Sequence, residues 1–217
     1  MSHPLVCTLL RSALQLLREV DVLKRLQHGN IVRLHSVLGQ AEEQDDDGHL
    51  LFLMEYAPGV ELFEEIMNRK HFTESDARPI FAQLVAAARY LHELNIVHRD
   101  IKPENILLLG LGGGTDQRTD HPPTCPHVKL IDFGLSKIVG GGAMATTFVG
   151  TPQYYAPEVE ITARLGQAAG GAGGAGGAGV GATGGYGVAA DCWSLGAVLY
   201  VMLSHSQYSV CGAKYVH

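Results

Sequence analysis

The stretch 98–105 reads HRDIKPEN, and the tripeptide 132–134 reads DFG. Short apolar runs flank the first stretch at 96–97 and 106–109, and a third run at 128–131 ends directly on the tripeptide. Runs of this length and composition predict short strands. We therefore expect HRDIKPEN to form a polar loop between two strands and DFG to follow a third.

The polar side chains of these two motifs are of the kinds that phosphate chemistry uses. Asp100 is a carboxylate, Lys102 an ammonium and Asn105 an amide, and Asp132 adds a second carboxylate. Gly134 allows the chain to turn sharply after it. Transfer of a phosphoryl group needs a base for the incoming hydroxyl, a cation at the phosphate and hard oxygen ligands for magnesium. The set supplies all three.

Two further motifs bracket a loop downstream of these residues. They are Gly150-Thr151-Pro152 and Ala156-Pro157-Glu158, and Thr146 and Thr147 lie just before them. In this order, H-R-D-x-K-P-E-N, D-F-G and A-P-E are similar to the signature set of protein kinases. The resemblance runs from about residue 12 to residue 204.

The resemblance implies a role for each matching polar residue. Asp100 would be the catalytic base and Lys102 the partner of the γ-phosphate, while Asn105 and Asp132 would bind Mg²⁺. Asp191, in the stretch DCWSLG, would anchor the backbone of the HRD loop. ATP and Mg²⁺ are the implied cofactors, and proteins are the implied substrates.

The resemblance also implies where a nucleotide would lie. Glu55 and Ala57 match the hinge whose backbone binds adenine, with Met54 at the gatekeeper position, and Leu107 would form the floor under the purine. Glu19 matches the helix glutamate that normally pairs with a strand lysine. A stacked apolar spine between the lobes would consist of Leu23, Leu34, His98 and Phe133. Taken singly, each of these residues is better interpreted as core, and only their joint register favours a function.

Substrate preference can also be predicted from the matching residues. Lys102 and Thr151 favour serine and threonine acceptors, because tyrosine kinases usually carry a different catalytic-loop pattern and lack G-T-P-x-Y. Glu61 and Glu104 match acids that receive substrate arginines, since a carboxylate can bind a guanidinium through two parallel hydrogen bonds. Glu61 could instead be an ordinary acid at a helix N-terminus.

A regulatory switch is predicted at Thr147, which matches the activating phosphothreonine of related kinases, with Thr146 as the alternate. Arg99 would pair with its phosphate. The partners implied are an upstream activating kinase or a second copy acting by autophosphorylation. Among kinases, the phrases EVDVLKRL, DFGLSK and DCWSLG are similar to the calcium/calmodulin-dependent group, most of all to checkpoint kinases of the FHA-domain type.

The rest of the chain predicts an α+β fold with two lobes, forming a single, partial kinase domain over 1–217. Helical spacing at 14–26 and strands at 31–38 and 50–56 assign 12–57 to a small-lobe remnant and hinge, and 58–217 to a mostly helical large lobe. Helices are expected at 61–69, at 191–203 and from Thr73 to about Leu94, with a Thr73–Asp76 capping box at the start of the last. The Gly-rich stretches 110–127 and 165–186 are expected to be exposed insertions.

Composition excludes several other classes of protein. The net charge of −6 gives no general attraction to nucleic acid or anionic membrane, and no run reaches membrane-spanning length. The scattered four cysteines argue against a disulfide framework or a structural zinc site, including one built on Cys125 and His127. We expect an intracellular protein of the cytoplasm or nucleus.

Two departures from the family pattern leave an alternative open. No Gly-rich loop precedes the first helix, and residues 1–11 contain no glycine or lysine, so Glu19 is expected to lack its partner. After residue 203 the chain leaves the pattern, so Glu158 is expected to lack its arginine. The alternative to an active kinase is therefore a non-catalytic kinase fragment or pseudokinase that acts by binding partners.

Overall fold

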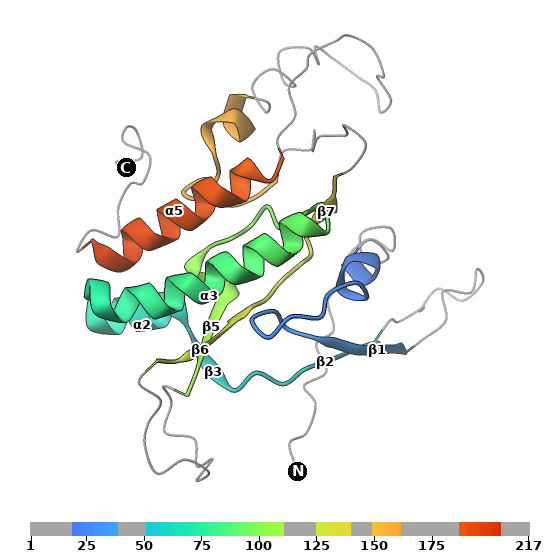
Figure 1. The fold of residues 1–217 in the computed structure, drawn as a ribbon, viewed down its shortest axis with the longest axis horizontal. Helices are drawn as coiled ribbons and strands as arrows, with labels where there is room; N and C mark the ends of the chain where they lie inside the picture. The colour runs from blue at the N-terminus through green and yellow to red at the C-terminus, as the bar shows by residue number, and fades with distance from the viewer. Residues whose placement is uncertain (1–18, 39–50, 111–124, 140–148, 162–186, 205–217) are drawn as a thin grey trace.

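The structure is a computed structural model, and it describes residues 19–38, 51–110, 125–139, 149–161 and 187–204 (Figure 1). Thr146, Thr147 and most of the two predicted insertions lie outside these residues. Two layers are visible in Figure 1, one of long helices and one of short strands. The catalytic motifs lie where these layers meet.

Three helices and two shorter helical segments lie in the described part of the chain. They are α2 (Leu62–Arg69), α3 (Glu74–Glu93) and α5 (Ala189–Leu203), with shorter helical segments at 19–23 and 157–161. The predicted start of α3 is confirmed, because the Thr73 hydroxyl accepts the Asp76 N–H at 3.2 Å. The Asp76 carboxylate in turn accepts the Thr73 hydroxyl at 2.9 Å.

The strands form three small antiparallel sheets. Strand β1 (Leu34–Leu38) pairs with β2 (Leu51–Met54), and β4 (Ile96–Val97) pairs with β7 (Lys137–Ile138). A three-stranded sheet has the order β3–β5–β6, made by Gly59–Glu61, Ile106–Leu109 and His127–Leu130. The 3-10 helix η1 (Pro103–Asn105) precedes β5 and ends the catalytic loop.

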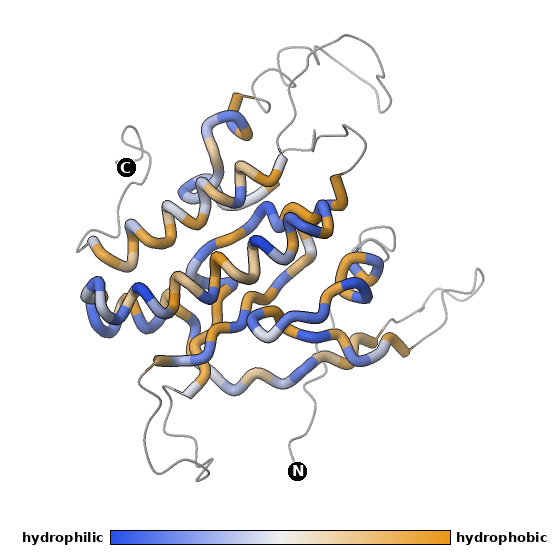
Figure 2. Tube along the Cα trace, viewed as in Figure 1, coloured by the Kyte–Doolittle hydropathy of each residue, from blue (hydrophilic) through white to orange (hydrophobic). Residues whose placement is uncertain are grey.

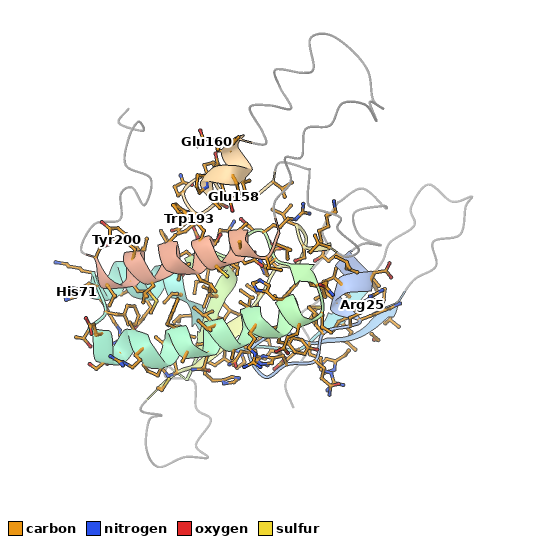
Figure 3. The ribbon with its side chains drawn as sticks, turned by 45° about the horizontal axis from the view of Figure 1, so that its top comes forward. Arg25, His71, Glu158, Glu160, Trp193 and Tyr200 are labelled. Carbon is orange, nitrogen blue, oxygen red and sulfur yellow. The ribbon has the colours of Figure 1, made fainter. Side chains whose placement is uncertain are left out.

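One hydrophobic core joins these layers. Helix α3 contacts α5, β4 and β6, and buries Ile80, Leu84 and Leu91 almost completely. Figure 2 shows that α5 is apolar along most of its length, and Val198 and Met202 are fully buried. The outer side of α5 nevertheless exposes Trp193 and Tyr200 (Figure 3).

Several element bounds differ from the sequence prediction. Strand β3 at Gly59–Glu61 and strand β7 were not expected, since each is too short to show a period-2 pattern. The first predicted strand begins at Leu34 rather than at residue 31, which makes only an isolated bridge to Leu130. His127 was assigned to an insertion, yet it begins β6 opposite Leu109.

The overall architecture agrees with the predicted α+β class, an incomplete two-lobed fold. The helical segment 19–23 and the β1–β2 pair lie on one side, and α2, α3 and α5 on the other (Figure 1). Among the described residues, no helix combines the length and hydrophobicity needed to cross a membrane.

Candidate active site

The HRD loop brings two of the predicted residues, Asp100 and Lys102, into direct contact with Thr151. The Lys102 ammonium lies 2.7 Å from Asp100 Oδ2 and donates to Thr151 Oγ1 at 3.0 Å. The Thr151 hydroxyl donates to Asp100 Oδ1 at 2.8 Å. Asn105 Nδ2 donates to the Asp100 carbonyl and to its Oδ2, at 2.9 and 3.1 Å. Both Asp100 oxygens are thus held in place by neighbouring donors.

The same donors set the charge of Asp100, which is only 6% exposed. Burial opposes ionisation of Asp100, but the hydrogen bonds from Lys102 and Thr151, the positive charge of Lys102 and the hydrogen bond from Asn105 outweigh it and lower its pKa. The carboxylate therefore stays ionised at neutral pH and can accept a hydrogen bond from an incoming hydroxyl.

Asp132 lies next to this cluster. The Asn105 carbonyl accepts the N–H of Ile131, the residue before Asp132, at 2.9 Å. Asp132 has a positive φ of 57°, and its Oδ1 accepts the Gly134 N–H at 3.1 Å. Asp100 and Asp132 both act electrostatically on the buried ring of His98.

The donor set at Asn105 and Asp132 fits a divalent cation. Both Asn105 amide hydrogen bonds use its nitrogen, and its oxygen accepts none within the described residues. An amide oxygen beside a carboxylate is a pair of hard ligands of the kind that Mg²⁺ prefers. The described residues hold no cluster of three or more His, Cys, Asp or Glu for a metal, at Cys125 and His127 or elsewhere.

Asp191 anchors the catalytic loop from the N-terminal turn of α5. This fully buried carboxylate accepts the N–H groups of His98 and Arg99, each at 2.9 Å. A third contact, to His92 Nε2 at 3.0 Å, comes from the last turn of α3. Asp191 on α5, held by His92 on α3, thereby fixes the backbone at His98 and Arg99. Arg99 adopts a positive φ of 69° there.

The predicted spine residues lie together in the core. The His98 and Phe133 rings meet edge to face, with centroids 4.8 Å apart. Leu23 and Phe133 are buried in one hydrophobic cluster, and the half-buried Leu34 packs against it. His98 Nε2 lies 3.2 Å from the Ile131 carbonyl, which ties the HRD loop to the segment before DFG.

The predicted hinge leaves β2 after Met54. The Glu55 N–H donates to the Arg33 carbonyl at 2.7 Å, and the Glu55 side chain pairs with Lys129 on β6 at 2.7 Å. The Glu55 carbonyl and the backbone of Ala57 form no hydrogen bond within the described ranges. Leu107, opposite Glu61 and Lys129 in the central sheet, is half-buried.

The predicted substrate acids lie on neighbouring elements. Glu61 ends β3, which contacts η1, where Glu104 is located. Glu104 Oε2 is buried and has no hydrogen-bond partner in the described structure. Burial and the nearby Glu104 charge raise the pKa of Tyr154 to about 12. Glu61, as the N-cap of α2, makes no side-chain capping bond.

Arg99, the predicted regulatory arginine, contacts the segment that follows DFG. Arg99 Nε donates to the Leu135 carbonyl. Its Nη1 is buried and has no partner among the described residues. Arg99 is thus held in place with part of its guanidinium unused.

Glu19 and Glu158 both take part in interactions in the structure, so neither side chain is without a partner. That they lack the lysine and the arginine of the family pattern stays a prediction. Residues Ala156 and Val159 pack on Ala190, so the segment carrying Glu158 rests against the start of α5 (Figure 3). This packing places Glu158 beside the start of α5.

Several residues that shape the site were not predicted from the sequence. They include the Lys129–Glu55 pair, the His92 contact to Asp191, and Gln83, which accepts from Asn30 and from Val128. Lys129, His92 and Gln83 belong to no motif, and each contacts a partner at least 45 residues away in the chain. The residue patterns alone give no signal for these contacts, and only the resemblance to kinases could have indicated them.

Comparison with known proteins identifies the family. The model for the protein kinase domain matches residues 10–212. This chain belongs to the protein kinase family. The kinase domain is 39% identical over 190 residues to the probable serine/threonine-protein kinase fhkD of Dictyostelium discoideum, covering 88% of this chain. It is 37% identical over 185 residues to myosin light chain kinase A of the same organism, covering 85%.

The chain spans only part of the length of these relatives, 22% of the first and 50% of the second. A probable myosin light chain kinase of Dictyostelium discoideum, 38% identical over 190 residues and 87% of this chain, is matched over 43% of its own length. The similarity therefore lies in the kinase domain.

Proposed function

We propose that the protein transfers the γ-phosphate of ATP to serine or threonine side chains of proteins. The carrying observation is the contact of Asp100, Lys102 and Thr151 within 3.0 Å of one another, because base, cation and acceptor-positioning hydroxyl meet at one point. The names of the relatives as serine/threonine kinases support the same activity.

In the proposed reaction the acceptor hydroxyl attacks the γ-phosphorus, the bond to the bridging oxygen of ADP breaks, and the hydroxyl proton passes to Asp100. Lys102 neutralises charge on the transferred group. Asn105 and Asp132 would hold Mg²⁺, which supplies charge neutralisation at the phosphates. Glu55 and Ala57 would bind adenine through their backbone groups, above Leu107.

The test is transfer of labelled phosphate from ATP to a serine peptide by the 217-residue chain. Asp100→Asn should reduce the rate by about 10² to 10⁴-fold, since it removes the base. Glu93→Gln, in an exposed ion pair on α3, is the matched control and should leave the rate unchanged. If wild type transfers no phosphate yet binds a partner protein, the non-catalytic alternative replaces this proposal.

We infer a preference for substrates with arginine near the acceptor. The support is Glu104 Oε2, which is buried without a partner and therefore suits a guanidinium, with Glu61 on the adjacent strand. Glu104→Gln should lower kcat/KM about 10-fold or more on an arginine peptide, and little on a peptide with norleucine at that position. Equal losses on both peptides would contradict the preference.

We also propose that phosphorylation of Thr147 activates the enzyme by pairing with Arg99. The support is the buried Arg99 Nη1, which lacks a partner among the described residues. After treatment with an activating kinase or autophosphorylation, Thr147→Ala should stay at the basal rate. Thr146→Ala is the control, and full activation of Thr147→Ala would move the switch to Thr146. An intracellular location, in cytoplasm or nucleus, fits this use of ATP.

A further inference from the structure

A second polar pocket lies away from the catalytic loop. It has a volume of about 390 Å³ and is lined by the loop 27–29, Arg33 and His35 of the β1 region, Glu55 and Lys129. Neither the stretch 98–105 nor the DFG segment contributes to its lining. The reaction proposed above uses the backbone of Glu55 and gives no role to the side chains that line this pocket.

Three of its side chains offer unused donors. The Arg33 and His35 side chains are exposed, and neither forms a hydrogen bond or ion pair within the described structure. His28 Nδ1 accepts the Asn30 N–H at 3.1 Å, so the neutral ring carries its proton on Nε2. That proton also has no acceptor in the described part of the chain.

Lys129 gives the pocket a fixed positive charge at its inner end. It is 7% exposed, and its Nζ contacts Glu55 Oε1 at 2.7 Å and Oε2 at 2.9 Å. The negative charge of Glu55 therefore neutralises the positive charge of Lys129, and the positive charge of Arg33 has no counter-charge among the residues that line the pocket. Burial, followed by the positive charge of Lys129, lowers the pKa of His28.

These features match a small, multiply charged anion. A guanidinium presents a planar fork of donors that suits phosphate, and two imidazole N–H groups can complete a set of charge-assisted bonds. The volume exceeds that of a bare phosphate, so an attached organic group fits as well. We propose that this pocket binds a phosphate monoester, separately from the site of phosphoryl transfer.

The test titrates the 217-residue chain with O-phosphoserine and follows the imidazole NMR signals of His28 and His35. Saturable shifts with a Kd below about 10 mM are expected, and serine should cause none. Arg33→Gln and His35→Gln should each weaken binding about 10-fold. Both side chains are exposed, Arg33 just before β1 and His35 within it, so neither change should unfold the protein.

Two controls separate this pocket from the catalytic site. Arg78→Gln removes an exposed charge on α3 and should leave the affinity unchanged. Lys102→Met should also leave these His shifts unchanged, even where it abolishes phosphate transfer. A phosphoserine peptide that binds more tightly than O-phosphoserine indicates a protein ligand, and equal affinity indicates a small metabolite. Failure to saturate, or wild-type affinity in Arg33→Gln and His35→Gln, overturns the proposal.

Discussion

His98 combines complete burial with a ring nitrogen that can titrate near neutral pH. Burial lowers its pKa, and this effect exceeds the opposing influence of Asp191, the Ile131 carbonyl, Asp100 and Asp132. As the pH falls below about 6.5, the unfolded chain takes up a proton here that the folded protein does not, so stability decreases. The stability that the neutral His98 side chain contributes is therefore lost as the pH falls below about 6.5 and is fully present above it.

We therefore predict that His98→Gln makes stability less dependent on pH. Gln can still donate to the Ile131 carbonyl, but it does not titrate. Between pH 7.5 and 5.5, wild type should lose up to about 1 kcal/mol more than the variant in the free energy of unfolding. Urea denaturation at the two pH values measures this difference, and parallel losses would contradict it.

Lys70 ends α2 in a backbone conformation that suits glycine. Its φ is 71°, and its N–H still donates to the Ile66 carbonyl at 2.7 Å. A side chain is disfavoured at positive φ, whereas glycine is not. Lys70→Gly should therefore raise the free energy of unfolding by about 0.5 kcal/mol, measured by thermal denaturation, while Lys70→Val should lower it.

Among the elements, the short strand β3 depends on the absence of a side chain at Gly59. A Cβ there would lie 2.7 Å from the Leu108 carbonyl oxygen of β5, which is backbone and cannot move away cheaply. Gly59→Ala should destabilise the protein by about 1–3 kcal/mol and loosen the β3–β5 pairing that positions Glu61.

Gly196 provides the matched comparison within α5. Nothing lies within 4 Å of the Cβ that alanine would add there, and the residue is exposed in a helix interior. Gly196→Ala should therefore stabilise by about 0.5–1 kcal/mol. Differential scanning calorimetry of both variants checks the pair, and a stabilising Gly59→Ala would contradict the strand geometry.

At the scale of the whole molecule, Gln83 connects α3 to two segments that are distant in the chain. Its Oε1 accepts from Asn30 Nδ2 at 2.9 Å and from the Val128 N–H at 3.0 Å, while its amide nitrogen donates to the Pro126 carbonyl at 3.0 Å. The Asn30 carbonyl in turn accepts a hydrogen bond from the Leu130 N–H. The small-lobe segment is thereby fastened to the sheet that ends at DFG.

Gln83→Leu should cost about 2 kcal/mol of stability, because it leaves the Val128 N–H without its acceptor and leaves Asn30 Nδ2 with only the Val128 carbonyl. Hydrogen exchange at the Val128 amide should accelerate more than global unfolding explains. Arg89→Gln on the exposed face of α3 is the control, with an effect within about 0.5 kcal/mol. Unchanged exchange at Val128 would show that this bond does not couple the segments.

The sequence alone determined the spacing of the HRD and DFG motifs, the capped start of α3 and the helix that carries Asp191. These depend on neighbours within a few residues, which local rules of turns, caps and periodicity describe. Strands β3 and β7 were not predicted, because neither is an apolar run: β3 begins at Gly59 and β7 at Lys137, and pairing with β5 and β4 defines them.

Only the tertiary structure decided which distant groups meet. Thr151 reaches Asp100 across 51 residues, Asp191 holds the His98 N–H across 93, and Lys129 pairs with Glu55 across 74. Each of these bonds exists because α3, α5 and the central sheet pack into one core and bring the segments together. No local pattern encodes such a contact, since its energy depends on burial and on partners that packing alone supplies.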